Sequence, residues 1–117
     1  MKLGPKQTAW IERLEKNDLP QGREQLRTKK GEFCCLGVAC VVLDEPIGDV
    51  GAYYLPESAV EDLGMHDDCG TPIDPEFGLS VKDIPNCAVM NDKYRLTFPQ
   101  IARVLREYSE YYFKHPK

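Results

Sequence analysis

The sequence predicts a compact, mainly α-helical single domain spanning residues 1–117, with a small α+β fold as the alternative. A chain of 117 residues can bury one hydrophobic core but is too short for two. Five segments carry helical apolar spacing or helix start and stop residues, and only the middle of the chain leaves room for a small β-hairpin. The longest uncharged run, at residues 33–43, is far below the roughly 20 residues that span a bilayer, so no membrane-spanning segment is expected.

The first helix is predicted at residues 5–16. It begins with a proline, which suits a first helical turn because the N–H that proline lacks would have no partner there. Trp10, Ile11 and Leu14 then share one face of the helix. The sequence Asn-Asp-Leu-Pro-Gln-Gly at 17–22 ends it. We expect Trp10 to anchor the core rather than to stack on a ligand.

Residues 33–43, Phe-Cys-Cys-Leu-Gly-Val-Ala-Cys-Val-Val-Leu, form the most apolar stretch and are predicted to be a buried helix. Their periodicity is equally compatible with a buried helix and with one or two strands. The length of eleven residues and the alanine within the run favour a helix, whereas Gly37 and the β-branched valines weaken that prediction. The Asp-Glu-Pro sequence at 44–46 ends the run.

The middle of the chain is predicted to hold one short helix and an acidic irregular segment. Residues 47–52 are turn-rich and are compatible with a loop or with half of a hairpin. A helix follows at 56–63, with Gly64 as its stop signal. Residues 66–86 contain three prolines, several aspartates and few apolar residues, so we expect an acidic irregular excursion.

Two further helical segments are predicted near the C-terminal end. Residues 87–90 fit a short buried helical turn before Asn-Asp at 91–92. Thr97 followed by Gln100 fits a capping box, which predicts the start of the last helix. The apolar stripe of that helix is Phe98, Ile101, Ala102, Leu105, Tyr108 and Tyr112.

Basic and acidic residues are unevenly distributed although the formal net charge is only −4. Residues 1–30 carry eight Lys and Arg against four Asp and Glu, residues 31–92 carry one lysine against thirteen acidic residues, and residues 93–117 carry six against two. If the two ends fold together, they form a basic face that attracts phosphate or an acidic partner. Alternatively, the basic ends neutralise the acidic middle within the fold.

The cysteines are predicted to be reduced thiols in the core. Five is an odd number, and the first residues lack the apolar segment of a secretion signal, which indicates the reducing cytosol. The alternatives are a redox thiol and a metal site, for which only His66 and Cys69 have a near-standard spacing. His66 is otherwise expected to be a solvated loop residue, and no metal or cofactor is predicted. The cysteines are Cys34, Cys35, Cys40, Cys69 and Cys87.

Sequence motifs of several common enzyme classes are absent. The chain has no G-x-x-x-x-G-K-[ST] phosphate loop, no G-x-G-x-x-G, no H-E-x-x-H and no EF-hand loop. A cysteine nucleophile needs a base, and the chain has only two histidines, of which His115 lies near the end of the sequence. We therefore predict a non-enzymatic protein without catalytic residues.

A polar, basic segment at residues 21–27, Gln-Gly-Arg-Glu-Gln-Leu-Arg, is the best candidate for a binding site. Its two arginines can present planar guanidinium groups to a phosphate, and its glycine allows close approach of the backbone. Amide side chains, that of Gln25 included, can add neutral contacts, and a Tyr-Arg pair at 94–95 supplies a ring and a cation. The predicted ligand-binding residues are Gln21, Gly22, Arg23, Arg27, Asn91 and Tyr94.

Two other interpretations of these residues stay open. The two arginines can instead pair with acidic residues of the middle segment, and Asn-Asp at 91–92 can simply end a helix. Duplex DNA is not an expected partner, because the last helical segment offers only Arg103, Arg106 and Lys114 as basic residues.

The order of these segments resembles a family of small proteins encoded mostly by tailed bacteriophages and prophages. The match covers about residues 8 to 108. The chain departs from the family pattern at Glu24, where relatives carry glycine, and at Met90, where they carry leucine. The resemblance brings no known catalytic or binding residues with it. The matching residues are Trp-Ile at 10–11, Gln-Gly-Arg at 21–23, Leu-Arg at 26–27, Phe-Cys-Cys-Leu-Gly-Val at 33–38, Cys40, Tyr-Leu-Pro at 54–56, Met-Asn-Asp at 90–92, Phe98 and Ile-Ala at 101–102.

The resemblance implies a phage accessory protein in the cytosol of the host bacterium. We expect it to counter antiviral defence by sequestering a small nucleotide-type signal. An alternative is a protein-binding inhibitor that presents acidic residues 57–76 to a basic host protein, and a metal-stabilised or thiol enzyme is a third, weaker hypothesis. The expected partners are a nucleotide-type molecule or a host protein, without a membrane, and self-association through the aromatic residues 111–113 is left open.

Overall fold

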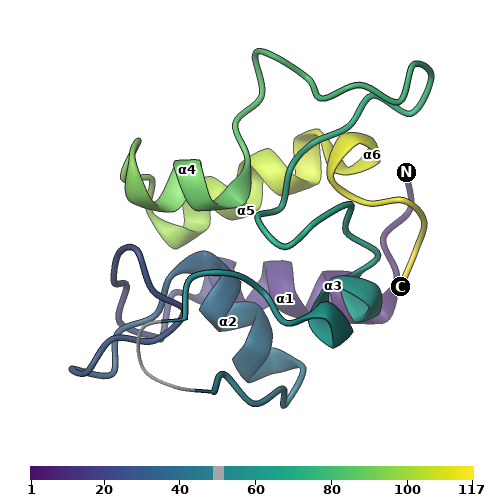
Figure 1. Cartoon of the computed structure of the whole chain (residues 1–117). Helices are drawn as coiled ribbons and strands as arrows, with labels where there is room; N and C mark the ends of the chain where they lie inside the picture. Colours follow the sequence, from purple (N-terminus) through teal and green to yellow (C-terminus); the bar gives the residue numbers. More distant parts are fainter. Residues whose placement is uncertain (49–51) are drawn as a thin grey trace.

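The computed structural model describes residues 1–48 and 52–117 and contains six helices within them. The mainly helical fold predicted from the sequence is confirmed, and the radius of gyration of 12.9 Å is near the value of about 13 Å expected for a compact chain of this length. The turn expected at 47–52 falls largely on residues outside the described ones. The helices are α1 (Pro5–Lys16), α2 (Cys35–Val42), α3 (Glu57–Leu63), α4 (Cys87–Asp92), α5 (Phe98–Glu107) and α6 (Ser109–Tyr112) (Figure 1).

Helix α1 lies at the centre of the packing and contacts α2, α3 and α5. Its predicted bounds are confirmed, and its apolar face of Trp10, Ile11 and Leu14 is fully buried. The Trp10 indole Nε1–H donates to the carbonyl oxygen of Cys35 at 3.0 Å, and the ring meets that of Phe113 edge-on with centroids 6.3 Å apart. Trp10 is therefore a core anchor, as predicted.

The N-terminus of α1 is closed by the last residues of the sequence, so the two ends of the chain lie close together (Figure 1). The backbone N–H groups of Lys6 and Gln7 both donate to the backbone oxygen of Lys117, at 2.8 and 3.1 Å. The buried Gln7 amide donates to the carbonyl oxygens of Leu63 and His115, each at 2.8 Å. These contacts satisfy helix-end N–H groups that would otherwise lack partners.

Helix α2 confirms the buried helix predicted for the apolar run, although it begins two residues later than expected. Its first six residues, from Cys35 to Cys40, are all buried. Gly37 is required because a Cβ atom there would lie 1.8 Å from the carbonyl oxygen of Leu26, in a segment that crosses directly over the helix. The apolar run is therefore covered by polar chain as well as by other helices.

All five cysteines are free, and four of them are buried in the core. Burial raises the pKa of the Cys34 thiol far above its ordinary range, and burial together with the nearby Glu45 carboxylate raises the pKa of Cys40 to about 11. Thiols in such surroundings are not ionised at neutral pH and act as packing groups. Cys69 is the exception, because it is half-buried.

The C-terminal helix predicted to continue to Tyr112 is divided in two. The capping box of Thr97 and Gln100 starts α5 as expected, but the helix ends at Glu107, and Tyr108 has φ −116° and ψ 33°, outside helical values. Helix α6 then places the buried Tyr112 so that its hydroxyl donates to the carbonyl oxygen of Pro85 at 2.6 Å. The break thus redirects an aromatic side chain to satisfy a distant backbone group.

The acidic middle of the chain is irregular, as predicted. Helix α3 ends at Gly64, which has φ +64°, a conformation that favours glycine. Beyond it, one isolated antiparallel bridge joins Ile73 to Ser80, so the small hairpin amounts to a single bridged turn. In the parts of the chain that the structure describes, no helix combines the length and the apolarity needed to cross a membrane.

Candidate functional site: a basic loop fixed over helix α2

The basic loop, residues 21–33, folds back on itself at one end of the molecule (Figure 1). The backbones of Gln21 and Arg27 form bridges with Phe33, one parallel and one antiparallel. The N–H of Gly22 donates to the carbonyl oxygen of Phe33 at 2.7 Å, and the N–H of Thr28 donates to that of Glu32 at 2.8 Å. These bonds hold Arg27 beside the start of the loop.

The buried side chain of Asn91 connects this loop to the core. Its Oδ1 accepts from the Gln21 side-chain amide at 2.9 Å and from the N–H of Cys35, the first residue of α2, at 3.1 Å. Its Nδ2 donates to the carbonyl oxygen of Gly22 at 2.9 Å and to Oδ1 of Asp92 at 2.8 Å. One amide therefore connects the basic loop, α2 and α4 with all its hydrogen-bonding positions filled.

Asp92 fixes the next part of the loop. Its Oδ1 also accepts from the backbone N–H of Glu24 at 2.8 Å. Glu24 has φ +64°, a left-handed conformation that favours glycine. The Asn-Asp pair therefore does more than end α4, because it sets the conformation of the basic loop.

Gly22 is buried, and its place in the structure differs from the expected approach to a ligand. A Cβ atom there would lie 2.9 Å from Cβ of Glu32 and 3.0 Å from Cγ2 of Thr28, so the glycine makes room for the loop itself. Its N–H and carbonyl groups are already bonded to Phe33 and Asn91. In this conformation Gly22 and Asn91 support the loop and have no group left with which to bind a ligand.

Arg23 and Arg27 lie half-buried on the loop. One Nη of Arg23 donates to the carbonyl oxygen of Gly22 at 3.2 Å. Within residues 1–48 and 52–117, the ion pairs do not include either arginine, so pairing with the acidic middle is not seen there. The ion pairs in those residues are Lys6–Asp62, Arg13–Asp18, Lys16–Asp18 and Arg106–Glu15.

Gln25, between the two arginines, has a side-chain oxygen that is buried and accepts no hydrogen bond. Buried polar atoms in folded proteins nearly always have a partner, so this acceptor marks a place for an N–H or O–H donor. Gln21 differs, because its Nε2 already donates to Asn91 and to the carbonyl oxygen of Leu96 at 2.8 Å. Only the oxygen of the Gln21 amide is left for another contact.

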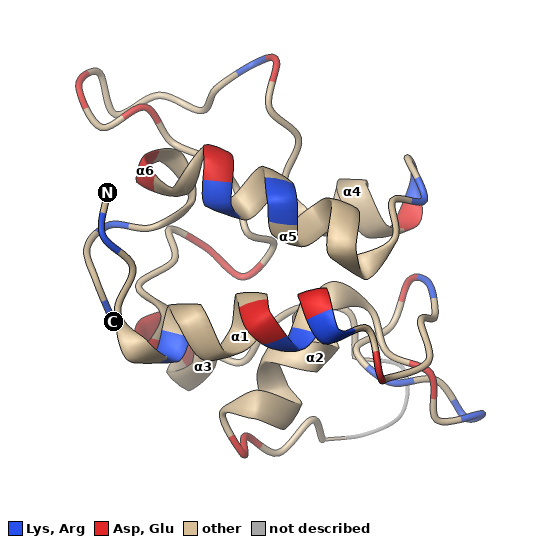
Figure 2. Ribbon diagram, turned by 180° about the vertical axis from the view of Figure 1, so that it is seen from behind, with Lys and Arg blue, Asp and Glu red and all other residues tan. Residues whose placement is uncertain are grey.

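The turn between α4 and α5, residues 93–97, lies next to the basic loop through the bond from Gln21 to Leu96. Tyr94 in this turn is 56% exposed, and the Lys93 ammonium lies 5.9 Å from the centre of its ring. The basic loop and this turn together form the basic end of the molecule, where Figure 2 shows lysines and arginines on both segments. The charged residues of the basic end are Arg23, Arg27, Lys29, Lys30, Lys93 and Arg95, with Glu24 and Glu32.

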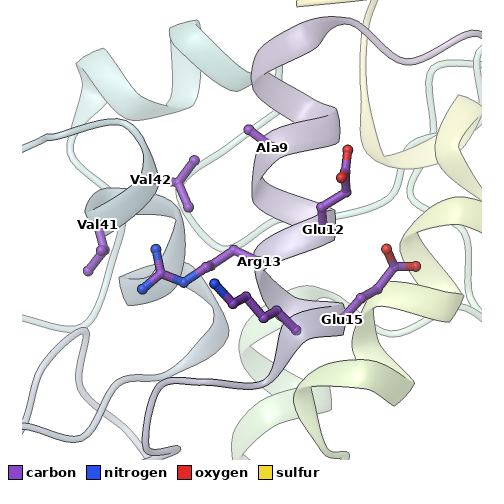
Figure 3. Close-up of a pocket in the computed structure, with 7 residues that line it drawn as sticks. Ala9, Glu12, Arg13, Glu15, Val41 and Val42 are labelled. Atoms are coloured by element: carbon purple, nitrogen blue, oxygen red, sulfur yellow. The ribbon is translucent and has the colours of Figure 1, made fainter.

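Away from the basic end, an open groove of about 800 Å³ lies between α1 and α2 and includes apolar side chains in its lining (Figure 3). Its charged groups are largely neutralised, since Arg13 pairs with Asp18 at 2.7 Å and Glu15 pairs with Arg106 at 2.7 Å. Sequence reasoning missed this groove, although two valines at the end of the apolar run were a signal. Its lining residues are Ala9, Glu12, Arg13, Glu15, Lys16, Val41 and Val42.

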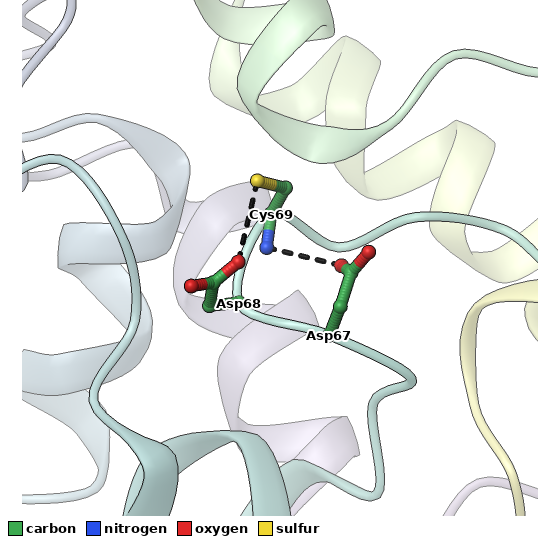
Figure 4. Close-up of side chains that lie close together, drawn as sticks. All are labelled: Asp67, Asp68 and Cys69. Carbon is green, nitrogen blue, oxygen red and sulfur yellow. Dashed lines mark hydrogen bonds between the residues drawn. The ribbon is translucent and has the colours of Figure 1, made fainter.

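The acidic middle brings Asp67, Asp68 and Cys69 together, with one potential ligand atom from each lying within 4.8 Å of the others (Figure 4). Oδ1 of Asp67 is used locally, because it accepts from the N–H groups of Cys69 at 3.0 Å and Thr71 at 2.9 Å. Burial and the Asp68 carboxylate raise the pKa of the Cys69 thiol to about 11. The three residues therefore form a turn that is stabilised by its own hydrogen bonds, and the other cysteines are not part of it.

His66 is not the solvated loop residue that the sequence suggested. It is half-buried, and its Nε2 is enclosed without a hydrogen-bond partner. Burial lowers the pKa of the imidazole, and the nearby Lys114 lowers it further, whereas the Tyr111 backbone and Asp67 act in the opposite direction. Burial therefore favours the neutral form of this ring.

The comparisons with known proteins add no relative to this description. Neither a protein-family model, nor a curated protein, nor a solved structure matches the chain.

Proposed function

We propose that the protein is a non-enzymatic binding protein whose basic end captures a small, phosphate-bearing ligand of nucleotide type. The observation that supports this most is the contrast between the hydrogen-bonded backbone of the basic loop and its two arginine side chains. Asn91 and Asp92 hold this loop with a hydrogen-bond network that is buried at Asn91, while Arg23 and Arg27 have no carboxylate partner among the described residues. A fixed backbone that presents two guanidinium groups lowers the entropy cost of binding.

The charge and chemistry of the basic end are suited to such a ligand. Its six Lys and Arg outweigh two glutamates, so a phosphate is attracted to it. Arg23 and Arg27 would hold the phosphate through planar, charge-assisted hydrogen bonds. The exposed ring of Tyr94 would stack on a base. The oxygen of Gln21 is a hydrogen-bond acceptor.

The proposal includes a biological role for this binding. The resemblance to small phage proteins supports a phage accessory protein that sequesters a nucleotide-type signal of the host's antiviral defence in the bacterial cytosol. Sequestration needs affinity but no chemistry, and the thiols of α2 are buried among apolar groups. The identity of the signal is a matter for direct screening.

The experiment is a thermal-shift screen of the protein with nucleoside mono-, di- and triphosphates and with short linear and cyclic oligonucleotides. A ligand at a hundred times its dissociation constant should raise the melting temperature by roughly 10 °C. Arg23→Ala combined with Arg27→Ala should abolish this shift and leave the melting temperature of the free protein within about 2 °C, because neither half-buried side chain takes part in an ion pair among the described residues.

The matched control is Arg103→Ala, which removes an exposed arginine from α5 outside the basic end. It should keep the full ligand-induced shift, which separates a local site from general charge attraction. The proposal is wrong if no compound in the panel stabilises the natural protein, or if the control loses the shift as completely as the double variant.

A further inference from the structure

A second surface of the molecule carries the two most exposed large apolar side chains of the described residues. Phe77 and Leu79 are each 69% exposed and lie in the acidic loop, residues 72–83. This loop projects from the body of the molecule on the side away from the basic loop (Figures 1 and 2). Because water is unfavourable for such groups, exposed aromatic and aliphatic side chains on a protruding loop are typical of contact sites.

The acidic loop is ordered by its own hydrogen bonds, without packing of its tip. Asp74 is the central residue: its N–H donates to the carbonyl oxygen of Leu79 and its carbonyl oxygen accepts from the N–H of Gly78, both at 2.8 Å. Its carboxylate accepts from the N–H groups of Glu76 at 2.8 Å and Phe77 at 3.3 Å. The two apolar side chains are therefore displayed in one backbone conformation before any partner arrives.

The charge around the loop indicates the chemistry of the partner. Residues 52–86 carry eight Asp and Glu against the single Lys82. Of these acidic residues only Asp62 takes part in an ion pair within the described part of the chain. A surface this negative repels nucleic acid and anionic lipid, and it attracts a surface rich in lysine and arginine.

We propose that the acidic loop is a docking site for a basic protein. Phe77 and Leu79 would enter an apolar pocket on that protein, and Glu76 and Asp83 would meet Lys or Arg side chains at the rim of the pocket. The two apolar side chains supply the buried contact, and the carboxylates supply orientation and rate of association. Because the basic end lies elsewhere, ligand and protein can be bound at the same time.

A second copy of the chain is a poorer occupant. The apolar groove between α1 and α2 carries Glu12 and Glu15 beside its cations, so it offers no net attraction for the acidic loop. The net charge of −4 also makes identical chains repel one another. Self-association is therefore the alternative that the experiment must detect.

The test places a photo-crosslinking amino acid, p-benzoylphenylalanine, at the exposed Ser80, which leaves both apolar anchors intact. The full-length protein is irradiated in a lysate of the cells in which the gene occurs, and the crosslinked segment is identified by mass spectrometry. The captured protein is then purified and its affinity is measured directly. We expect its crosslinked segment to contain Lys or Arg next to apolar residues.

Four variants decide whether that binding uses the acidic loop. Phe77→Ser with Leu79→Ser should weaken binding about tenfold or more, and Glu76→Lys with Asp83→Lys should weaken it and reduce its salt dependence. Val41→Ser, which changes the exposed apolar residue of the groove, and Arg23→Ala with Arg27→Ala should leave the affinity unchanged. Because Phe77 and Leu79 and the two acidic residues are exposed, their variants should melt within about 2 °C of the natural protein.

Three outcomes overturn the proposal. The first is an adduct that consists of two copies of this chain, with a mass that rises with concentration in the purified protein. The second is the absence of any light-dependent adduct. The third is binding that survives the loss of Phe77 and Leu79. The failure of this proposal leaves the thermal-shift result at the basic end untouched, so the two proposals fail separately.

Discussion

The basic loop and the acidic loop are two irregular segments of similar length that are held in place in opposite ways. The basic loop is tied to the core by Asn91 and Asp92 and crosses α2 directly above Gly37. The acidic loop is closed by Asp74 and reaches the helices through a bond from the N–H of Ile73 to the carbonyl oxygen of Tyr111, at 2.8 Å.

This difference determines how each loop responds to change. Disturbing the supports of the basic loop also disturbs α2 and α4, so its conformation is coupled to the stability of the whole domain. Disturbing the acidic loop opens a local turn whose tip packs against nothing. A ligand at the basic end should therefore stabilise the protein globally, whereas a partner at the acidic loop should protect mainly that loop.

The largest effect is expected for Asn91→Leu, which tests directly whether the basic loop is coupled to the core. The substitution removes the partner of the buried Cys35 N–H, and it removes one of the two partners of the Gln21 amide and of the Gly22 carbonyl oxygen. We expect a loss of about 4 kcal/mol in the free energy of unfolding, measured by urea denaturation. Hydrogen exchange should accelerate in the basic loop and not in the acidic loop.

The matched control is Asn86→Leu, which removes an asparagine that only caps α4. Its Oδ1 accepts from the N–H of Val89 at 2.8 Å, so the expected loss is about 1 kcal/mol. If the two substitutions cost the same, Asn91 is an ordinary cap and the coupling between loop and core is wrong.

The next largest effect is expected for Gly37→Ala. The added Cβ would lie 1.8 Å from the carbonyl oxygen of Leu26, so the basic loop must move away from α2. We expect a loss of about 2–3 kcal/mol and, with it, weaker ligand binding at the basic end. Gly78→Ala in the acidic loop is the counterpart, since no atom lies near its Cβ and the cost is limited to its φ of +69°. A ligand affinity unchanged by Gly37→Ala contradicts the prediction.

A smaller and local effect is expected for Asp74→Ala. It removes the acceptor of the Glu76 and Phe77 N–H groups, and exchange of those two amides should rise about fivefold, which corresponds to about 1 kcal/mol. Asp74→Asn keeps an acceptor oxygen and should keep the slow exchange despite the lost charge. The global free energy of unfolding should change by less than about 0.5 kcal/mol in both variants. A large global loss would show that this loop, too, is part of the core.

Much of the fold was predictable because its signals are local. A proline at the first turn gave the start of α1, the Thr97–Gln100 capping box gave that of α5, and Gly64 gave the end of α3. The break at Tyr108 was not predictable, since it accompanies a long-range contact. The Tyr112 hydroxyl bonds to the carbonyl oxygen of Pro85, a residue far away in the sequence. Such a contact leaves no trace in helical periodicity.

The candidate site was predictable in part for the same reason. The sequence indicated a basic segment and a Tyr-Arg pair, and the turn that contains Tyr94 is bonded to the basic loop through Leu96. The supporting role of Asn91 depends on a bond to Gln21, 70 residues away, and could not be inferred from composition. The exposure of Phe77 and Leu79 was not predictable, because an irregular segment has no periodicity that shows which apolar side chains are buried.

The smallest expected effect concerns pH and is confined to the acidic side of the molecule. Burial lowers the pKa of His66, so the unfolded chain binds a proton more tightly than the folded chain does. The stabilisation is complete above the ordinary histidine value of about 6.5 and is lost as the pH falls below it. Carboxylates whose pKa is also lowered, those of Glu15, Asp18 and Asp67, add a further loss only near about pH 4.

The difference between the free energies of unfolding at about pH 7.5 and about pH 5.5 therefore measures the contribution of His66. His66→Gln should flatten the decline over this range. Because the Tyr111 backbone contacts both His66 and the N–H of Ile73, amide protection at the lower pH, measured relative to the intrinsic exchange rate at that pH, should be lost first at the base of the acidic loop. A decline that persists in His66→Gln, or that begins in the basic loop, would assign the pH sensitivity to another group and remove this distinction between the two loops.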